Sequence, residues 1–161
     1  MKDELRKIRC CLIGHRPQSL KRLEDDVKVD LENGIVKTIA EGYTTFISGM
    51  TYGVDIWAAE IVIRLKQSDP KLHLIAAIPF PGFEEEWAED WCSRYRYLLS
   101  RAEYVKVMEP GYSKEAYQRR NEWMVDHSGK VIAVCNGQPG GTRDAIQYAR
   151  VCKKRVLYIS G

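Results

Sequence analysis

Short apolar runs alternate along the chain with longer segments in which apolar residues repeat at helical spacing. The apolar runs predict strands over residues 8–13, 44–48, 72–78, 104–108, 131–135 and 155–159. The helical spacing predicts helices over residues 20–41, 54–66, 85–100, 114–128 and 142–152. This alternation is typical of βαβ units, in which successive strands are parallel.

Three of the predicted strands, 8–13, 72–78 and 131–135, are almost continuously apolar. Strands have continuously apolar sequences when helices cover both faces of a parallel sheet. We therefore expect an α/β fold with a Rossmann-like, doubly wound and mostly parallel sheet, flanked by helices in three α/β/α layers. No linker or repeat interrupts the pattern, so residues 1–161 are expected to form a single domain.

The loops that follow the predicted strands carry the candidate chemistry. In an open parallel sheet, ligands bind beyond the carboxyl ends of the strands, where these loops meet. The candidate ligand-binding residues in the loops are Gly14, His15, Arg16, Ser48, Gly49, Met50, Gly53, Asp55, Pro79, Gly140, Gly141 and Thr142.

The segment Gly140-Gly141-Thr142 gives the clearest physical reason for binding a phosphate. Two glycines let the backbone approach a ligand closely, and the Thr142 hydroxyl can cap the helix that follows. The free N–H groups and the helix dipole then favour a phosphate or a carboxylate. The alternative interpretation is a tight turn before an ordinary helix cap.

The loop after residues 44–48 forms a second candidate wall, because Gly49 and Gly53 flank its turn. Asp55 lies in the first turn of the next helix, where it either binds a ribose hydroxyl or only complements the helix dipole. Arg16 either reaches the same crevice or lies in solvent. His15 is either a titrating group or a loop histidine bonded to backbone.

Two further groups lie on predicted helices. Arg119 and Arg120 point to different sides of their helix, so we expect one at the surface and the other, with Asn121, closing over the ligand. Aromatic residues are enriched after Pro81, and they form either a core and rim stripe or a surface that stacks on bases. These aromatic residues are Trp87, Trp91, Tyr95 and Tyr97.

Composition narrows the class of protein. The net charge of +3 gives no sign of a nucleic-acid binder that depends on bulk charge. The five cysteines form no C-x-x-C pair and no Cys/His cluster, so we expect small, reduced, buried residues and no metal site. The apolar run near the N-terminus is too short for a signal peptide or a membrane span, which predicts a cytoplasmic protein without membrane insertion.

Residues 13–16 and 46–59 together resemble the signature of the SLOG superfamily, which includes DNA-processing protein A and the LOG phosphoribohydrolases. Residues 79–82, 117–126 and 140–142 continue the resemblance, which spans roughly residues 8–159. The nearest branch is YpsA-like, a group of small bacterial proteins linked to cell division and stress. The resemblance implies a Rossmann-like fold and a nucleotide-derived ligand.

LOG enzymes release a base from a nucleoside monophosphate, and the resemblance implies which residues that reaction needs. It needs an arginine before the Gly-Gly loop, for which Arg119 or Arg120 is available, and a glutamate three residues after the threonine. Ala145 occupies that second position here, and Asp144 is one residue away, about 100° around the helix. We therefore assign no catalytic residue and expect binding rather than turnover.

The leading hypothesis is a protein that binds or senses a nucleotide-derived, phosphate-bearing small molecule, similar to ADP-ribose or NAD. It requires no cofactor or metal, and it leaves open whether the chain forms a homo-oligomer. One alternative is a nucleoside-monophosphate phosphoribohydrolase of the LOG kind. The other is single-stranded DNA binding, as in DNA-processing protein A.

Overall fold

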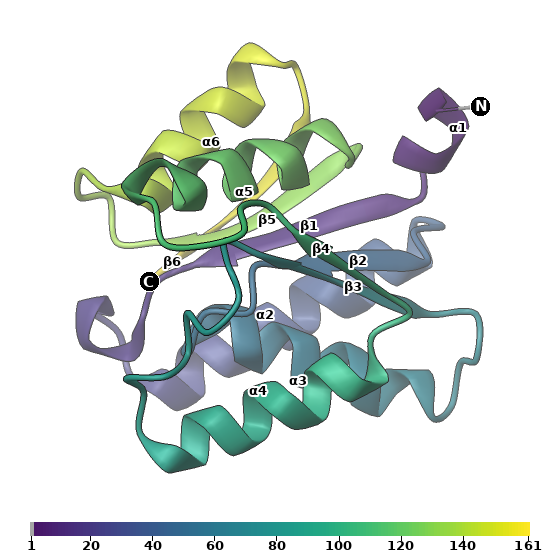
Figure 1. Cartoon of the computed structure of the whole chain (residues 1–161). Coiled ribbons are helices and arrows are strands. Elements are labelled where there is room, and N and C mark those ends of the chain that lie inside the picture. The colour runs from purple at the N-terminus through teal and green to yellow at the C-terminus, as the bar shows by residue number, and fades with distance from the viewer. Residues whose placement is uncertain (1) are drawn as a thin grey trace.

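The computed structural model describes residues 2–161, and its centre is one sheet of six parallel strands (Figure 1). The strand order is β4-β3-β2-β1-β5-β6, and every neighbouring pair is parallel. The strands are β1 (Arg9–Gly14), β2 (Thr45–Ser48), β3 (His73–Ile78), β4 (Tyr104–Val107), β5 (Lys130–Cys135) and β6 (Arg155–Ser160).

Helices cover both faces of this sheet. The helices are α1 (Lys2–Arg6), α2 (Glu24–Ala40), α3 (Val54–Lys66), α4 (Glu89–Arg101), α5 (Lys114–Asp126) and α6 (Gly141–Val151). Helices α2, α3 and α4 lie on one face, and α5 and α6 lie on the other (Figure 1). The predicted three-layer, doubly wound α/β/α fold is confirmed.

Strand β1 shows how the apolar runs build two cores. Cys10 and Leu12 belong to the core under α2, α3 and α4, whereas Cys11 and Ile13 belong to the core under α5 and α6. Successive side chains of a strand point to opposite faces, so a strand covered on both sides needs apolar residues throughout. The edge strands β4 and β6 are partly exposed, and their sequences are accordingly more mixed.

Two helix starts differ from the predicted ones. Helix α4 begins at Glu89 rather than at residue 85, because the chain before it forms turns around Gly82, whose φ is +82°. Helix α2 begins at Glu24 rather than at residue 20, because a short 3₁₀ helix at Pro17–Ser19 and a bend precede it. The short helix α1 was not predicted.

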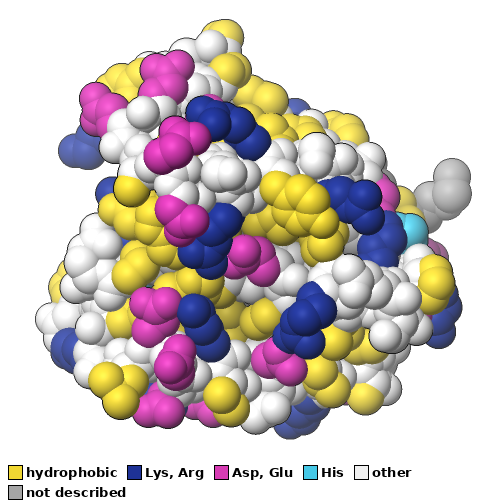
Figure 2. Space-filling model, turned by 90° about the horizontal axis from the view of Figure 1, so that it is seen from below, with side chains coloured by type: hydrophobic (Ala, Val, Ile, Leu, Met, Phe, Trp, Pro, Cys, Tyr) yellow, Lys and Arg dark blue, Asp and Glu magenta, His cyan; other side chains and the backbone are white. Residues whose placement is uncertain are grey.

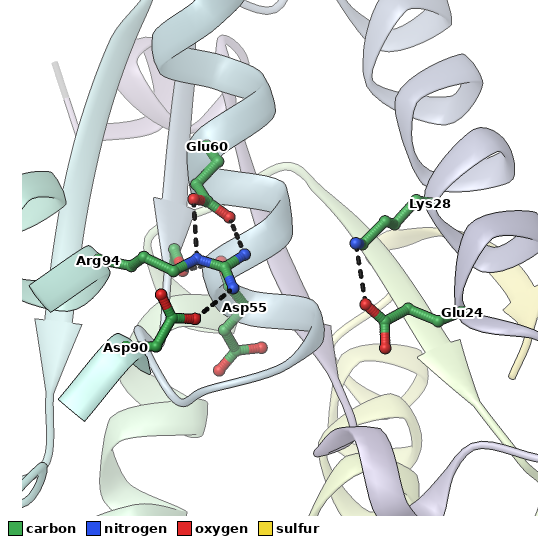
Figure 3. A network of polar contacts seen from close by, with 7 residues as sticks. Glu24, Lys28, Asp55, Glu60, Asp90 and Arg94 are labelled. Carbon is green, nitrogen blue, oxygen red and sulfur yellow. Dashed lines mark hydrogen bonds and ion pairs between the residues drawn. The ribbon is translucent and has the colours of Figure 1, made fainter. Parts of the chain in front are cut away.

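Ion pairs connect elements on the outside of the sheet. Arg94 of α4 donates to Glu60 of α3 at 2.6 Å and to Asp90 at 3.4 Å (Figure 3). Figure 2 shows the face on which α2, α3 and α4 lie, where side chains of both charge signs are spread among apolar ones. Within residues 2–161, no helix combines the length and the apolar character that crossing a membrane requires.

A second group of ions lies at the amino ends of the strands. The Lys130 ammonium at the start of β5 is 4% exposed and donates to Glu41 at 2.5 Å. Arg155, at the start of β6, donates to the same carboxylate at 2.7 Å. We call these three residues the amino-end ion cluster, and it joins the end of α2 to two strands.

The strand order places the chemistry at the opposite end of the sheet. The chain proceeds from β1 through β2 and β3 to β4 on one side, and then returns to the other side of β1 as β5 and β6. The loops after β1 and β5 therefore diverge around a crevice at the carboxyl ends of these strands. This is the topological switch point, where doubly wound proteins bind their ligands.

Candidate functional site

A cavity of about 390 Å³ occupies this crevice. Its lining includes the predicted residues Gly14, His15, Arg16, Asp55, Arg120, Asn121, Gly140, Gly141 and Thr142. The other predicted site residues do not line it: Ser48, Gly49, Met50, Gly53, Pro79 and Arg119. The structure thus brings together residues from loops more than a hundred positions apart in the sequence.

Ser48 and Met50 shape the cavity wall from behind. The Ser48 hydroxyl donates to the backbone carbonyl of Asp55 at 2.9 Å and accepts the Met50 N–H at 3.1 Å. Met50 is fully buried and has a φ of +62°, a conformation that side-chain-bearing residues rarely adopt. This loop is therefore fixed by internal contacts, and it holds the start of α3 in place.

Two glycines allow α3 to approach the end of β1. A Cβ atom on Gly14 would lie 2.3 Å from Val54 Cγ1, and one on Gly53 would lie 2.7 Å from the His15 carbonyl oxygen. The Val54 N–H donates to that same carbonyl at 3.1 Å. Only glycine permits this close packing, which brings the first turn of α3 to the crevice.

Gly49 contributes through its backbone. Its carbonyl accepts a hydrogen bond from Arg120 Nη1 at 2.6 Å. A Cβ atom at this position would lie 2.8 Å from Asp55 Oδ2 and 3.0 Å from Arg120 Cζ. Because Gly49 has no side chain, the Asp55 carboxylate and the Arg120 guanidinium both fit beside it.

The two adjacent arginines have opposite surroundings. Arg120 is 6% exposed, donates from Nε to Asn121 Oδ1 at 3.0 Å, and lies 5.6 Å from the centre of the Tyr117 ring. Arg119 points to solvent and pairs with Glu109, whose N–H donates to the Pro79 carbonyl. Arg120 is thus the arginine of this helix that faces the crevice.

Asp55 is the buried acid of the site. Burial raises the pKa of its carboxyl to about 6, although Arg120, the Thr51 and Gly14 amides and Arg16 all act to lower it. Oδ2 accepts the Thr51 N–H at 3.3 Å, but Oδ1 is buried and has no hydrogen-bond partner among residues 2–161. In Figure 3 no contact joins Asp55 to the Arg94 ion pairs. A buried oxygen left without a donor costs free energy, so this atom is suited to accept a hydrogen bond from a ligand.

His15 presents a neutral imidazole to the crevice. Its Nε2 accepts the backbone N–H of Asn136 at 2.9 Å, which leaves no room for a proton on that nitrogen. Burial also lowers the pKa of His15. The histidine therefore links the loop after β1 to the loop after β5.

Helix α6 starts at the cavity with its first turn uncapped. It begins at Gly141, and Gly140 holds the cap position with a φ of +154°. No side chain of the described residues caps it, so the expected capping role of Thr142 was wrong: Thr142 lies inside the first turn. The free N–H groups of that turn favour an anion.

Several lining residues were not predicted. They are Leu12, Ile13, Ser19, Thr51, Tyr117, Met124, Asn136 and Pro139. Asn136 follows β5 directly, so the carboxyl-end rule could have found it. Tyr117 lies one helical turn before Arg120 and Asn121, and the i, i+3 and i, i+4 spacing was a usable signal.

The acid nearest to the expected hydrolase position lies elsewhere. Asp144 does not line the crevice; it lines a neighbouring cavity between α5 and α6 together with Ala145 and Tyr148. Ala145, at the position where the hydrolases carry their glutamate, lines that same neighbouring cavity and not the crevice.

Known proteins resemble this chain in sequence and in fold. A UPF0398 protein of Halalkalibacterium halodurans is 33% identical over 132 residues, which cover 80% of this chain and 68% of the relative. The SPbeta prophage-derived protein YoqJ of Bacillus subtilis is 33% identical over 144 residues, which cover 82% of each chain. A solved structure of DNA processing protein A from Helicobacter pylori, described for its single-stranded DNA binding mode, aligns with a TM-score of 0.66 at 19% identity.

That last alignment covers 98% of this chain and 66% of the Helicobacter structure, and at such low identity it shows a common fold only. The decisive match is to a family model. The YpsA model, described as the YspA SLOG family, matches residues 10–156, nearly the whole chain. The resemblance in the glycine loops is therefore confirmed, and this chain belongs to the YpsA SLOG family.

Proposed function

We propose that this protein binds a nucleotide-derived, phosphate-bearing small molecule in the crevice between the loops after β1 and β5. One observation carries the proposal: Asp55, whose buried Oδ1 has no hydrogen-bond partner among the described residues, lines the same cavity as the uncapped start of α6. An acceptor for a hydroxyl and a donor set for an anion, facing one cavity, fit the two polar groups of a ribose phosphate.

In this proposal the phosphate lies at Gly140, Gly141 and Thr142. The first-turn N–H groups of α6 donate to it, and the dipole of the helix adds to the attraction. Space is available, because a Cβ atom on Gly141 would meet only Asn121 Nδ2, at 4.0 Å. Arg120 and Arg16, which line the same cavity, supply positive charge.

The ribose then lies toward Asp55. A ribose hydroxyl that donates to Oδ1 would satisfy the orphaned acceptor. Ionised Asp55 is also the stronger acceptor, so a bound hydroxyl lowers the pKa of the carboxyl. ADP-ribose and NAD are the model ligands, and a cytoplasmic location, where such molecules are abundant, remains our prediction.

Isothermal titration with ADP-ribose, NAD, AMP and ribose 5-phosphate tests the proposal. We expect Gly141→Asp to weaken binding by at least about tenfold, because its carboxylate repels the phosphate. The variant should still fold, since an acidic residue suits the start of a helix. Gly111→Asp adds the same charge where a Cβ atom meets nothing within 4 Å, and it should bind as the wild type does. No binding of any of these ligands would contradict the proposal.

Two readouts separate this function from its rivals. Chromatography of AMP incubated with the protein shows free adenine only if the chain is a phosphoribohydrolase, for which Asp144 is misplaced. Titration with a labelled single-stranded oligonucleotide at rising salt shows steeply weakening binding only if the chain is a DNA binder. We expect neither result.

A further inference from the structure

A second cavity adjoins the crevice and has no role so far. Its volume is about 520 Å³, within the range of small-molecule sites. Six aromatic side chains contribute to its lining: Tyr52, Phe80, Phe83, Trp87, Tyr112 and Tyr117. Phe80 and Phe83 belong to the hydrophobic core, whereas Tyr112 is largely exposed.

The two cavities share two lining residues. Arg16 and Tyr117 line both of them. The Arg16 guanidinium lies 5.0 Å from the centre of the Tyr52 ring. Arg16 therefore stands at the boundary, and a ligand longer than a sugar phosphate could extend past it.

The charges of the two cavities differ. The crevice offers Arg120 and the start of α6, which attract an anion. The second cavity carries the carboxylates Glu85 and Glu86, with Arg16 at its edge. Two carboxylates disfavour a phosphate in the second cavity, but they accept hydrogen bonds from N–H groups.

The rings themselves form a wall of edge-to-face pairs. Phe80 pairs with Tyr112 at 5.5 Å and with Tyr117 at 5.7 Å, and Tyr52 pairs with Trp87 at 5.3 Å. Aromatic walls bind flat aromatic ligands, and every nucleobase has a face that stacks on such rings. The chemistry of the second cavity thus matches a planar ring that bears N–H donors.

We propose that the second cavity binds the nucleobase of the same ligand whose phosphate occupies the crevice. This inference rests on the proposed function and extends it from the phosphate and the ribose to the base of the ligand. The base stacks on the aromatic wall, and an amino group on its edge donates to Glu85 or Glu86. The ligand class is accordingly a nucleotide with an amino-bearing base, rather than a bare sugar phosphate.

Titration of ribose 5-phosphate against AMP tests the base site. We expect wild-type protein to bind AMP about tenfold or more tightly than ribose 5-phosphate, the gain that stacking on aromatic residues gives. Tyr112→Ala should remove most of that gain and leave the affinity for ribose 5-phosphate unchanged. Tyr112 is 78% exposed, so this variant is expected to fold.

Two controls sharpen the result. Tyr97→Ala removes another exposed tyrosine, on α4 and outside both cavities, and it should bind both ligands as the wild type does. Purine riboside monophosphate, which lacks the amino group of AMP, should bind more weakly than AMP to the wild type. The doubly substituted Glu85→Ala/Glu86→Ala protein should bind the two nucleotides equally.

The outcomes separate the two proposals. If ribose 5-phosphate binds and AMP binds no more tightly, the base site is wrong while the phosphate site stands. The base site is also wrong if Tyr112→Ala weakens both ligands equally. If neither ligand binds, and ADP-ribose and NAD do not bind either, the proposed function and the base site fail together.

Discussion

Asp55 gives the site its pH dependence. A carboxyl whose pKa is about 6 in the folded protein and 3.8 in the unfolded chain binds its proton more tightly when folded. The folded state therefore loses stability as the pH rises from about 4 to 6, by about 3 kcal/mol from this group. The same burial leaves Asp55 half ionised near pH 6, where its strength as an acceptor changes.

Replacing Asp55 by asparagine should remove that pH dependence. We expect Asp55→Asn to unfold at a higher urea concentration than the wild type above pH 6, and at a similar one near pH 4. Urea unfolding at several pH values between 4 and 8 measures the difference. Asp26→Asn, at an exposed carboxyl, is the control. Parallel curves for wild type and Asp55→Asn would show that Asp55 does not titrate in this range.

The space at Gly49 is a second residue-scale feature with a measurable cost. A methyl group there must displace Asp55 Oδ2 and the Arg120 guanidinium, so Gly49→Ala should destabilise the fold by roughly 1–3 kcal/mol. Gly111→Ala, which meets nothing within 4 Å, should stay within about 0.5 kcal/mol of the wild type. Denaturant unfolding compares them, and equal stability would mean that Gly49 is not constrained.

At the scale of elements, most of the strands and helices could be predicted from the apolar pattern. The prediction was poorest before α4, where Gly82 and the aromatic residues around Trp87 form turns instead of a first helical turn. Helical spacing could not reveal this, because Trp87 packs against Tyr52, which lies in the loop after β2. The same contacts contribute to the second cavity, and of the aromatic residues singled out in the sequence only Trp87 lines it.

The amino-end ion cluster joins three elements and should stabilise the fold at neutral pH. Hydrogen bonds from Lys130 and Arg155 lower the pKa of Glu41 from 4.5 to about 2. Because the folded-state pKa is the lower one, the stabilisation is complete above about pH 4.5 and is lost as the pH falls toward 2.

Glu41→Gln tests the cluster. We expect a lower urea midpoint at pH 7, since the Lys130 ammonium is left buried without its carboxylate. The gap between variant and wild type should close as the pH approaches 2. Glu24→Gln, which breaks an exposed pair with Lys28, should change little. An unchanged urea midpoint for Glu41→Gln would show that the cluster does not stabilise the fold.

At the scale of the whole molecule, the reactivity of the cysteine thiols measures whether the core between the helices and the sheet excludes solvent. Cys10, Cys11, Cys92 and Cys135 are buried, and burial raises the pKa of Cys11 to about 12. Only Cys152 is half-buried. A thiol reagent at pH 8 should therefore label one cysteine quickly in the native protein and five in urea. Cys152→Ser should abolish the fast label; persistence of fast labelling would indicate that the core opens locally.

The whole-molecule architecture was predictable because continuous apolar strands admit few arrangements other than a covered parallel sheet. The contact among Arg120, Asp55 and Gly49 was harder to predict from the sequence. Each residue lies in a segment with an ordinary structural explanation, and only the packing of α5 against the loop after β2 decides that Arg120 rather than Arg119 turns inward.

The position of the amino-end ion cluster, at the far end of the sheet from the crevice, has a consequence for how such a protein can diversify. The residues of the crevice and those of the amino-end ion cluster share no strand end, so their substitutions should be close to additive. A library randomised at the crevice loops can be selected for a new ligand while the amino-end ion cluster keeps its contribution to stability. Within a family of this fold, ligand specificity can then change faster than folding stability.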